Sequence, residues 1–236
     1  MGAPTQPVWG IIGGGGPRAG VHLTHTLWAQ RAQEVGHPLC QDADYPAVLL
    51  DTRPLAGLGP HGVTEASRFA QEVAQRAFQL VRAGATRVVL ACVSGHVHVD
   101  SDQMPSAWLD LRTLGLTALA QAPSALTVVM ECRESAGQLA KDLAARGQAV
   151  LQLSDLDQAR VDALIQRGMA GQLELVHARA LWAEWRSQGV TRVVLGCSDL
   201  GGGLGSASLG LEENVVDVLD LGLRQANACA YLRNSA

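Results

Sequence analysis

Short hydrophobic runs rich in β-branched residues alternate with longer amphipathic stretches along this chain. The clearest amphipathic stretch is 64–82, where Phe69, Val73 and Ala77 fall on one helical face and Thr64 is a candidate N-cap. Such alternation is typical of βαβ units and predicts an α/β fold with parallel sheets flanked by helices. The expected strands are 8–12, 47–51, 87–92, 126–130, 149–153 and 192–197, and the expected helices are 18–35, 64–82, 135–146 and 172–187.

One segment of the chain occurs twice in nearly identical form. Residues 84–92 read GATRVVLAC and residues 189–197 read GVTRVVLGC, which are identical at seven of nine positions and begin 105 residues apart. Buried parallel strands are rich in valine and leucine, but this does not explain the shared Gly, Thr, Arg and terminal Cys. The repeat therefore predicts two pseudo-symmetric lobes. We expect an N-terminal lobe over 1–117, a C-terminal lobe over 118–204, and a segment 205–236 that packs back onto the first lobe.

Composition excludes several classes of protein. The 236 residues are 47% hydrophobic with a net charge of −4, which describes a globular protein without a nucleic-acid surface. No apolar run approaches 18 residues and no signal peptide is recognisable, so we expect a cytoplasmic protein without a membrane contact. The five scattered cysteines are expected to be reduced thiols. Lys141 is the single lysine and lies in a surface amphipathic stretch, which disfavours a pyridoxal-phosphate Schiff base.

Each copy of the repeat ends on a cysteine, Cys92 in the first and Cys197 in the second. Ligands of open α/β sheets bind beyond the carboxyl ends of the strands, so two facing lobes would bring both thiols to one cleft. Thiols on opposite sides of a cleft suit the removal of a proton from one face of a carbon and the delivery of a proton to the other face. One thiol would be held as the thiolate by nearby donors or a positive environment. We expect Cys92 and Cys197 to be this catalytic pair.

Three motifs, in order, resemble the cofactor-independent aspartate/glutamate racemases, and in particular the aspartate racemase branch. Residues 13–20 read GGGGPRAG where that family typically has GGMGPxAT, residues 92–96 read CVSGH for CNTAH, and residues 196–200 read GCSDL for GCTEL. The resemblance covers most of the chain. It implies two similar α/β lobes with the active site between them, usually a dimer, and a pair of cysteines that exchange the α-proton of an amino acid without pyridoxal phosphate.

The chain departs from the family pattern at several positions. Val93 replaces an Asn that hydrogen-bonds the backbone groups of the substrate in the family, and Gly15 and Gly20 replace a Met and a Thr. The segment 131–135, ECRES, stands where the family often has a T-x-x-T pair. The resemblance therefore predicts the reaction class more firmly than the substrate.

Two further features are candidates for substrate binding. Gly15 and Gly16 are expected to bring N–H groups to a substrate carboxylate, the alternative being a tight turn without a ligand. The same turn matches a dinucleotide fingerprint, but Asp51 lies 35 residues beyond Gly16, whereas the acidic partner is expected about 20 residues on. Arg53 follows a predicted strand. In acid-specific relatives a basic residue in this region meets the distal carboxylate of the substrate; the alternative is a surface arginine.

Polar residues also follow both cysteines. Ser94, Ser198 and Asp199 are expected to contact the substrate, although Asp199 is equally suited to capping the glycine-rich turn that follows it. His96 is expected either to assist Cys92 in proton transfer or to be structural. His96 and His98 form an H-x-H pair without a third ligand at a standard spacing, so no metal is expected.

The expected function is therefore a cofactor-independent racemase or epimerase of a small α-amino acid, acting as a homodimer. Arg53 favours aspartate or glutamate as the substrate. Two alternatives remain open from the sequence. One is a superfamily isomerase or decarboxylase of small dicarboxylates, which uses cysteine on the same scaffold, and the other is a non-catalytic small-ligand-binding protein of the same fold.

Overall fold

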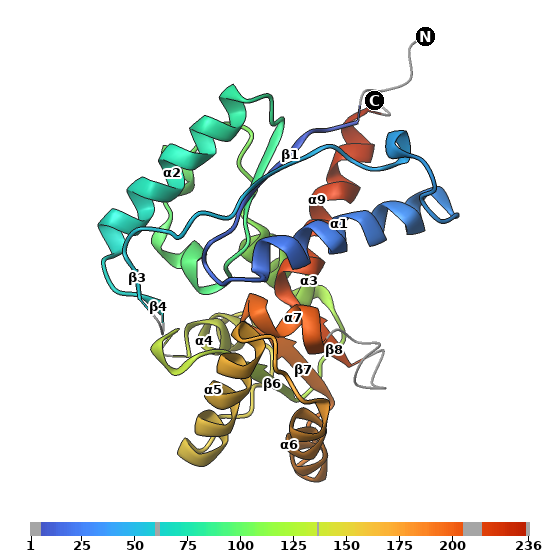
Figure 1. Cartoon of the computed structure of the whole chain (residues 1–236). Helices are drawn as coiled ribbons and strands as arrows, with labels where there is room; N and C mark the ends of the chain where they lie inside the picture. Colours follow the sequence, from blue (N-terminus) through green and yellow to red (C-terminus); the bar gives the residue numbers. More distant parts are fainter. Residues whose placement is uncertain (1–5, 60–61, 136, 205–213, 235–236) are drawn as a thin grey trace.

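Two three-stranded parallel sheets, one in each half of the chain, form the framework of the protein (Figure 1). The computed structural model describes residues 6–59, 62–135, 137–204 and 214–234. The first sheet has the order β2-β1-β5 and the second has the order β6-β7-β8. Their strands are β1 (Trp9–Ile12), β2 (Val48–Asp51), β5 (Arg87–Leu90), β6 (Thr127–Met130), β7 (Arg192–Leu195) and β8 (Val215–Asp217).

Helices cover both faces of each sheet. They are α1 (Ala19–Val35), α2 (Ala66–Arg82), α3 (Leu111–Gln121), α4 (Gln138–Ala145), α5 (Asp155–Met169), α6 (Leu175–Ser187), α7 (Ser198–Leu204) and α9 (Val218–Asn234). The 3-10 turns are η1 (Asp42–Asp44), η2 (Ser94–His98), η3 (Ser101–Gln103) and η4 (Arg133–Ser135). A small antiparallel hairpin, β3 (Leu58–Gly59) with β4 (Gly62–Val63), extends from the first lobe. The predicted α/β fold class is confirmed.

The repeated segment folds in the same way in both lobes. Gly84 and Gly189 end the preceding helical turns with φ of 105° and 89°, a left-handed conformation that favours glycine. Arg87 pairs with Trp9 of β1, and Arg192 pairs with Thr127 of β6, so each RVVL strand lies beside the strand that opens its lobe. The two cysteines consequently leave their sheets at equivalent points.

The side chains of each repeated strand alternate between two cores. Val88 and Leu90 face α2, whereas Val89 points to the other side of the first sheet. That side shares one apolar cluster with the second sheet, and we call this cluster the inner core; it includes Ile11, Leu23, Val89, Leu111, Val129, Val194, Val218 and Leu223. The outer face of the second sheet packs against α5 and α6 in a third cluster. The two lobes are therefore joined through a continuous apolar core.

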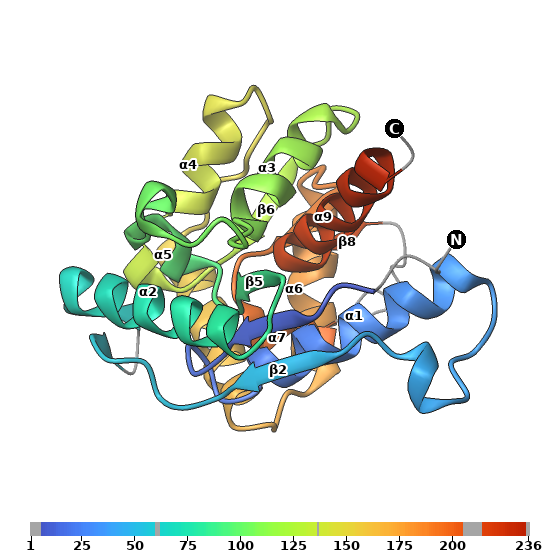
Figure 2. The ribbon, with the colours of Figure 1, turned by 90° about the horizontal axis from the view of Figure 1, so that it is seen from above.

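The C-terminal segment contributes to both lobes. β8 pairs with β7 in the second sheet, whereas α9 runs alongside α3 and also contacts α1 (Figure 2). Gly115 and Gly222 make the α3–α9 contact close, because a Cβ at position 222 would stand 2.0 Å from the carbonyl oxygen of Leu111 and one at position 115 would stand 2.3 Å from that of Val218. Residues 205–213 lie outside the described residues, and the lobe boundaries stay a prediction.

Several predicted elements differ from the structure. The strand expected at 149–153 is reduced to a single bridge between Val150 and Thr127. Thr64 does not cap α2; its hydroxyl donates instead to the carbonyl of Gly57 in the preceding loop, and the helix begins at Ala66. The helix expected at 135–146 is divided into η4 and the shorter α4. Helices α3, α5 and α9 were not predicted.

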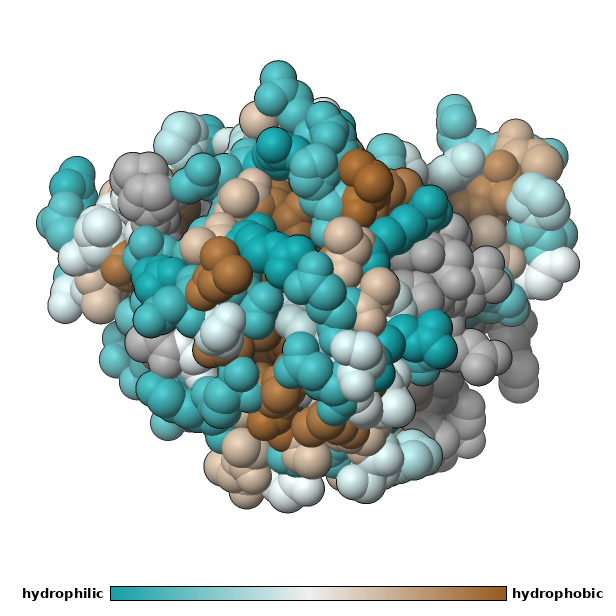
Figure 3. Space-filling model, turned by 90° about the horizontal axis from the view of Figure 1, so that it is seen from below, coloured by the Kyte–Doolittle hydropathy of each residue, from teal (hydrophilic) through white to brown (hydrophobic). Residues whose placement is uncertain are grey.

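No helix in the described part of the chain is long and apolar enough to cross a membrane. On the face seen from below, hydrophobic side chains lie in small groups among hydrophilic ones (Figure 3).

Candidate active site

A cavity of about 590 Å³ lies between the two lobes, within the range of small-molecule sites. The first lobe contributes the glycine loop after β1, the segment after β5 and the β3–β4 hairpin. The second lobe contributes the segments that follow β6 and β7 and one face of α5. The cavity therefore lies at the carboxyl ends of parallel strands from both sheets, which is the usual position of ligands in α/β folds.

Both cysteines of the repeat line this cavity. Cys92 is buried, its Sγ lies 3.7 Å from the Ser94 hydroxyl oxygen, and the Gly95 N–H points to the same sulfur. Burial raises the pKa of the Cys92 thiol, and these two donors offset only part of that shift. The structure therefore places the first thiol in the expected cleft, with a pKa above that of an exposed cysteine.

Cys197 enters the cavity from the second lobe, immediately before α7. Burial is also the main cause that raises its thiol pKa, and the N–H of Asp199 partly offsets it. The charges of Asp199 and of the neighbouring thiols raise the pKa further. The groups that lower the two thiol pKa values are hydrogen-bond donors, namely Ser94 and Gly95 at Cys92 and the Asp199 N–H at Cys197. No positively charged side chain is among the causes that lower these pKa values in the described residues.

The glycine loop packs directly against both halves of the site. A Cβ at position 15 would stand 2.7 Å from the Cβ of Cys92 and 3.1 Å from its sulfur. A Cβ at position 16 would stand 2.0 Å from an oxygen of Asp199, in the other lobe. A side chain at position 15 would therefore require Cys92 to shift, and a side chain at position 16 would require the Asp199 carboxylate to turn away from the loop. The backbone N–H groups of Gly15 and Gly16 donate to no other group among the described residues, so they are free to receive a ligand.

The carboxylate of Asp199 lies against this loop. Its side chain is buried at the start of α7, and the backbone N–H of Arg18 lies 3.4 Å from one carboxylate oxygen. Burial raises the pKa of Asp199, whereas the Arg18 N–H and the charges of Arg18 and His22 lower it. Ser198, also buried, lines the cavity beside it, as Ser94 does from the first lobe. The structure thus brings Cys92, Cys197, Asp199 and the glycine loop together.

His96 lies behind Cys92 and outside the cavity lining. Its Nδ1–H donates to the carbonyl oxygen of Cys92 at 2.7 Å, and its Nε2 is buried 3.9 Å from an oxygen of Asp110, without a hydrogen bond. Burial lowers the pKa of His96. A histidine held in this way orients the Cys92 backbone and does not face the thiol as a base.

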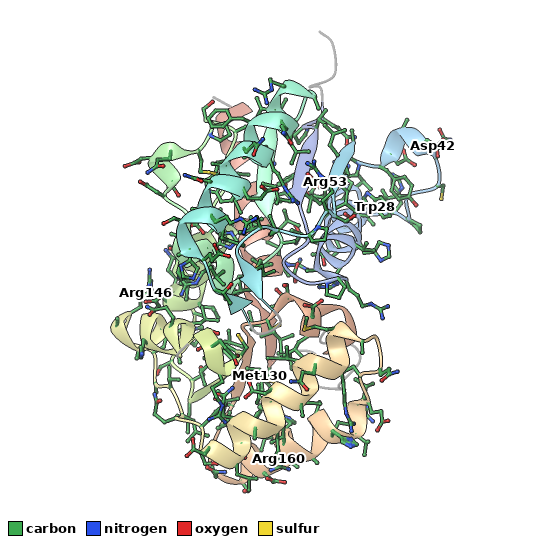
Figure 4. All side chains as sticks on the ribbon, turned by 60° about the vertical axis from the view of Figure 1, so that its left-hand side comes forward. Trp28, Asp42, Arg53, Met130, Arg146 and Arg160 are labelled. Atoms are coloured by element: carbon green, nitrogen blue, oxygen red, sulfur yellow. The ribbon has the colours of Figure 1, made fainter. Side chains whose placement is uncertain are left out.

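Arg53 lies in the first lobe beyond β2, outside the cavity lining (Figure 4). Its Nε donates to Asp51 at 2.9 Å and its Nη2 donates to the side chain of Gln79 at 3.2 Å, and 63% of its side chain is exposed. This placement does not support Arg53 as the ligand of a distal substrate carboxylate, because its guanidinium already donates to Asp51 and Gln79 and does not line the cavity.

Further residues of the second lobe line the cavity. Cys132, Arg133 and Glu134 follow β6, and the Cys132 sulfur lies 3.1 Å from the Ser135 hydroxyl oxygen. Helix α5 presents one face to the cavity, with spacing i, i+3, i+4 and i+7, from Asp162, Ile165, Gln166 and Met169. The cap that begins α5 was visible in the sequence as Ser154 three residues before Asp157, whose N–H donates to the serine hydroxyl.

No group of three or more His, Cys, Asp or Glu side chains within the described ranges is arranged to hold a metal ion. The H-x-H pair is divided between two environments. His96 is buried, and the His98 ring meets the Phe69 ring edge-on at 6.3 Å.

Comparison with known proteins identifies the fold. No protein-family model and no curated protein sequence matches the chain. Among solved structures, an aspartate racemase homologue from Pyrococcus horikoshii matches with a TM-score of 0.72 at 17% identity, covering 95% of this chain and 99% of the other. The aspartate racemase of Picrophilus torridus also matches with a TM-score of 0.72 at 17% identity, covering 95% of this chain and 94% of the other. Glutamate racemase from Thermus thermophilus matches with a TM-score of 0.62 at 14% identity, covering 97% and 82%. The chain therefore has the fold of the aspartate and glutamate racemases.

Proposed function

We propose that this protein is a cofactor-independent amino-acid racemase or epimerase, related to the aspartate/glutamate racemases, in which Cys92 and Cys197 exchange the α-proton. The observation that carries the proposal is that two thiols, at equivalent strand ends of two lobes, line one cavity. A non-catalytic binding protein has no need of this symmetry.

The burial of both thiols fits the chemistry. An α-proton of an amino acid is weakly acidic, so its removal needs a strong base, and a thiolate whose pKa is raised is a stronger base than an exposed one. In the proposed reaction the thiolate on one side takes the α-proton and leaves a carbanion. The thiol on the other side then gives its proton to the opposite face. The product is the other enantiomer, and the two sulfurs have exchanged their protonation states.

The neighbouring polar groups suit the two charges of an α-amino acid. In this proposal the carboxylate of Asp199, which lies against Gly16, accepts from the substrate ammonium group. The N–H groups of Gly15 and Gly16, which donate to no described group, donate to the substrate carboxylate. Donors to that carboxylate also stabilise the negative charge that develops when the α-proton leaves. Ser94 and Ser198 supply further hydroxyl groups from the two sides.

The experiment is racemisation of a panel of amino acids, followed by chiral chromatography and by α-deuterium incorporation in deuterium oxide. Cys92→Ala and Cys197→Ala should each abolish interconversion of the enantiomers, because each removes one of the two proton carriers. Cys40→Ala, which changes an exposed thiol outside the cavity, is the matched control and should keep wild-type activity. Interconversion at the wild-type rate in either cavity variant contradicts the proposal.

The homodimer, which the family resemblance implies, and the cytoplasmic location, which is expected from the sequence, are part of the same proposal. Sedimentation of the purified chain measures the oligomeric state directly.

A further inference from the structure

We infer that the substrate is an α-amino acid whose side chain carries no second carboxylate. The inference rests on the proposed function and names the substrate class of that same site. Aspartate and glutamate, the substrates favoured by the sequence through Arg53, are therefore predicted to be poor.

The charges of the cavity lining are the first reason. Among the described residues that line it, three carry a carboxylate, namely Glu134, Asp162 and Asp199, and one carries a cation, Arg133. The substrate ammonium group suits one of these carboxylates. A second substrate carboxylate would add negative charge to a lining that already has an excess of it, and like-charge contacts in a partly desolvated site are unfavourable.

The one guanidinium of this lining is already engaged. The Arg133 Nε lies 3.3 Å from an Asp162 oxygen, and its backbone N–H donates to the other oxygen at 3.1 Å. Its Nη1 lies 3.6 Å from the carboxylate of Asp155. Gln158 also donates to Asp162, at 2.9 Å, which holds the carboxylate in place. A distal substrate carboxylate at Arg133 would have to share the guanidinium with Asp162 and Asp155, whose charges already offset it.

The remaining arginine candidates face elsewhere. Arg53 is bound to Asp51 on the first lobe, and Arg112 is bound to Asp142 on the far side of Glu131, outside this lining. Arg18 lies near Asp199 but outside the cavity lining, and its charge acts on that carboxylate, so Arg133 is the one described cation of this lining.

The wall that remains is uncharged. On α5, Ile165 and Met169 provide apolar surface and Gln166 provides an amide, while Val93 and Leu58 face the cavity from the first lobe. Val93 matters here because it stands where the related enzymes have a polar Asn. Such a wall suits an aliphatic side chain or a neutral side chain that forms hydrogen bonds.

Two isosteric pairs of substrates test the inference. Glutamine and glutamate, and asparagine and aspartate, differ by an amide in place of a carboxylate, so shape is nearly constant within each pair. We expect kcat/KM for the racemisation of the amide to exceed that of the acid in at least one pair, on the order of a hundredfold. Alanine, methionine and leucine complete the panel and report on the apolar wall.

The outcomes separate this inference from the proposed function. Racemisation in which aspartate or glutamate is the best substrate overturns the inference and leaves the proposed function standing. Racemisation of none of the panel, with no α-deuterium incorporation, contradicts the proposed function, and the inference falls with it. Preference for an uncharged amino acid supports both.

A substitution tests the cause of the selectivity. Asp162→Asn removes one carboxylate and releases Arg133, so kcat/KM for glutamate should rise relative to glutamine by about tenfold or more. Glu184→Gln makes the same change of charge at an exposed ion pair with Arg160, outside the cavity, and should leave the ratio unchanged. A ratio that is identical in wild type and Asp162→Asn overturns the assignment of selectivity to these charges. Circular dichroism of each variant checks that the chain is folded.

Discussion

Gly15 lies against Cys92 so closely that a single methyl group on the glycine would stand 2.7 Å from the Cβ of the cysteine. Cys92 is buried beneath the loop, and neither backbone is free to move away, because the Gly14 turn packs on the Arg53 carbonyl on its other side. The position of the Cys92 thiol therefore depends on the absence of a side chain at Gly15.

Gly15→Ala should consequently lower kcat strongly, by about a hundredfold, because the thiol must shift and the reaction depends on its alignment. The measurement is steady-state racemisation together with the melting temperature. Gly202→Ala is the matched control: the Cβ that it adds lies 3.4 Å or more from its neighbours and falls within a helix, where alanine is favourable. Unchanged activity of Gly15→Ala would show that the loop is not held against Cys92.

Asp199→Asn should raise KM for the amino acid by about tenfold to a hundredfold, because an amide replaces the carboxylate that accepts from the ammonium group. The negative charge of Asp199 also raises the pKa of both thiols, so its removal should lower these pKa values. The pH dependence of alkylation by iodoacetamide measures them. Thiol pKa values that stay the same or rise in Asp199→Asn contradict this arrangement of charges.

The stability of the protein should fall at alkaline pH. Both buried thiols have a pKa above that of an unfolded cysteine, about 8.5, so above that pH the unfolded chain loses thiol protons that the folded protein keeps. The slope of the unfolding free energy with pH is then negative, and the stabilisation present below about pH 8.5 is progressively lost at higher pH. Urea unfolding between pH 7 and pH 10 measures this slope. The double variant Cys92→Ala/Cys197→Ala should show a shallower fall, and an equal slope in the two proteins would contradict the raised pKa values.

His96→Ala should lower kcat with little change in KM, because the imidazole holds the Cys92 carbonyl and touches no cavity surface. Loss of the buried donor should also cost about 1 to 3 kcal/mol of stability. His96→Asn keeps an N–H donor at nearly the same position and should recover most of the kcat. If His96 were the general base, Asn would not restore activity, so the comparison of the two variants separates positioning from proton transfer.

The sequence predicted the parts of the site that a local pattern encodes. The repeated RVVL strands, the cysteines after them and the glycine loop are contiguous motifs, and strand ends converge in an α/β fold whatever the loops contain. The contribution of α5 was missed because its cavity face, from Asp162 to Met169, mixes charged, polar and apolar residues and so lacks a continuous apolar stripe. The ion pair of Arg53 with Asp51, two residues away, is a feature that spacing along the chain does not reveal, and the guanidinium does not line the cavity.

The inner core has a consequence for how this protein is built. Val89 of the first sheet and Val194 of the second belong to the same apolar cluster, with α3 and α9 between the lobes. Neither half of the chain encloses that cluster by itself, so we expect the molecule to melt in a single transition, and a chain cut near residue 117 to yield fragments that fold only together. The apolar side chains that fold the protein then also fix the separation of the two thiols. A substitution in the inner core should therefore alter the reaction at both faces of the substrate carbon.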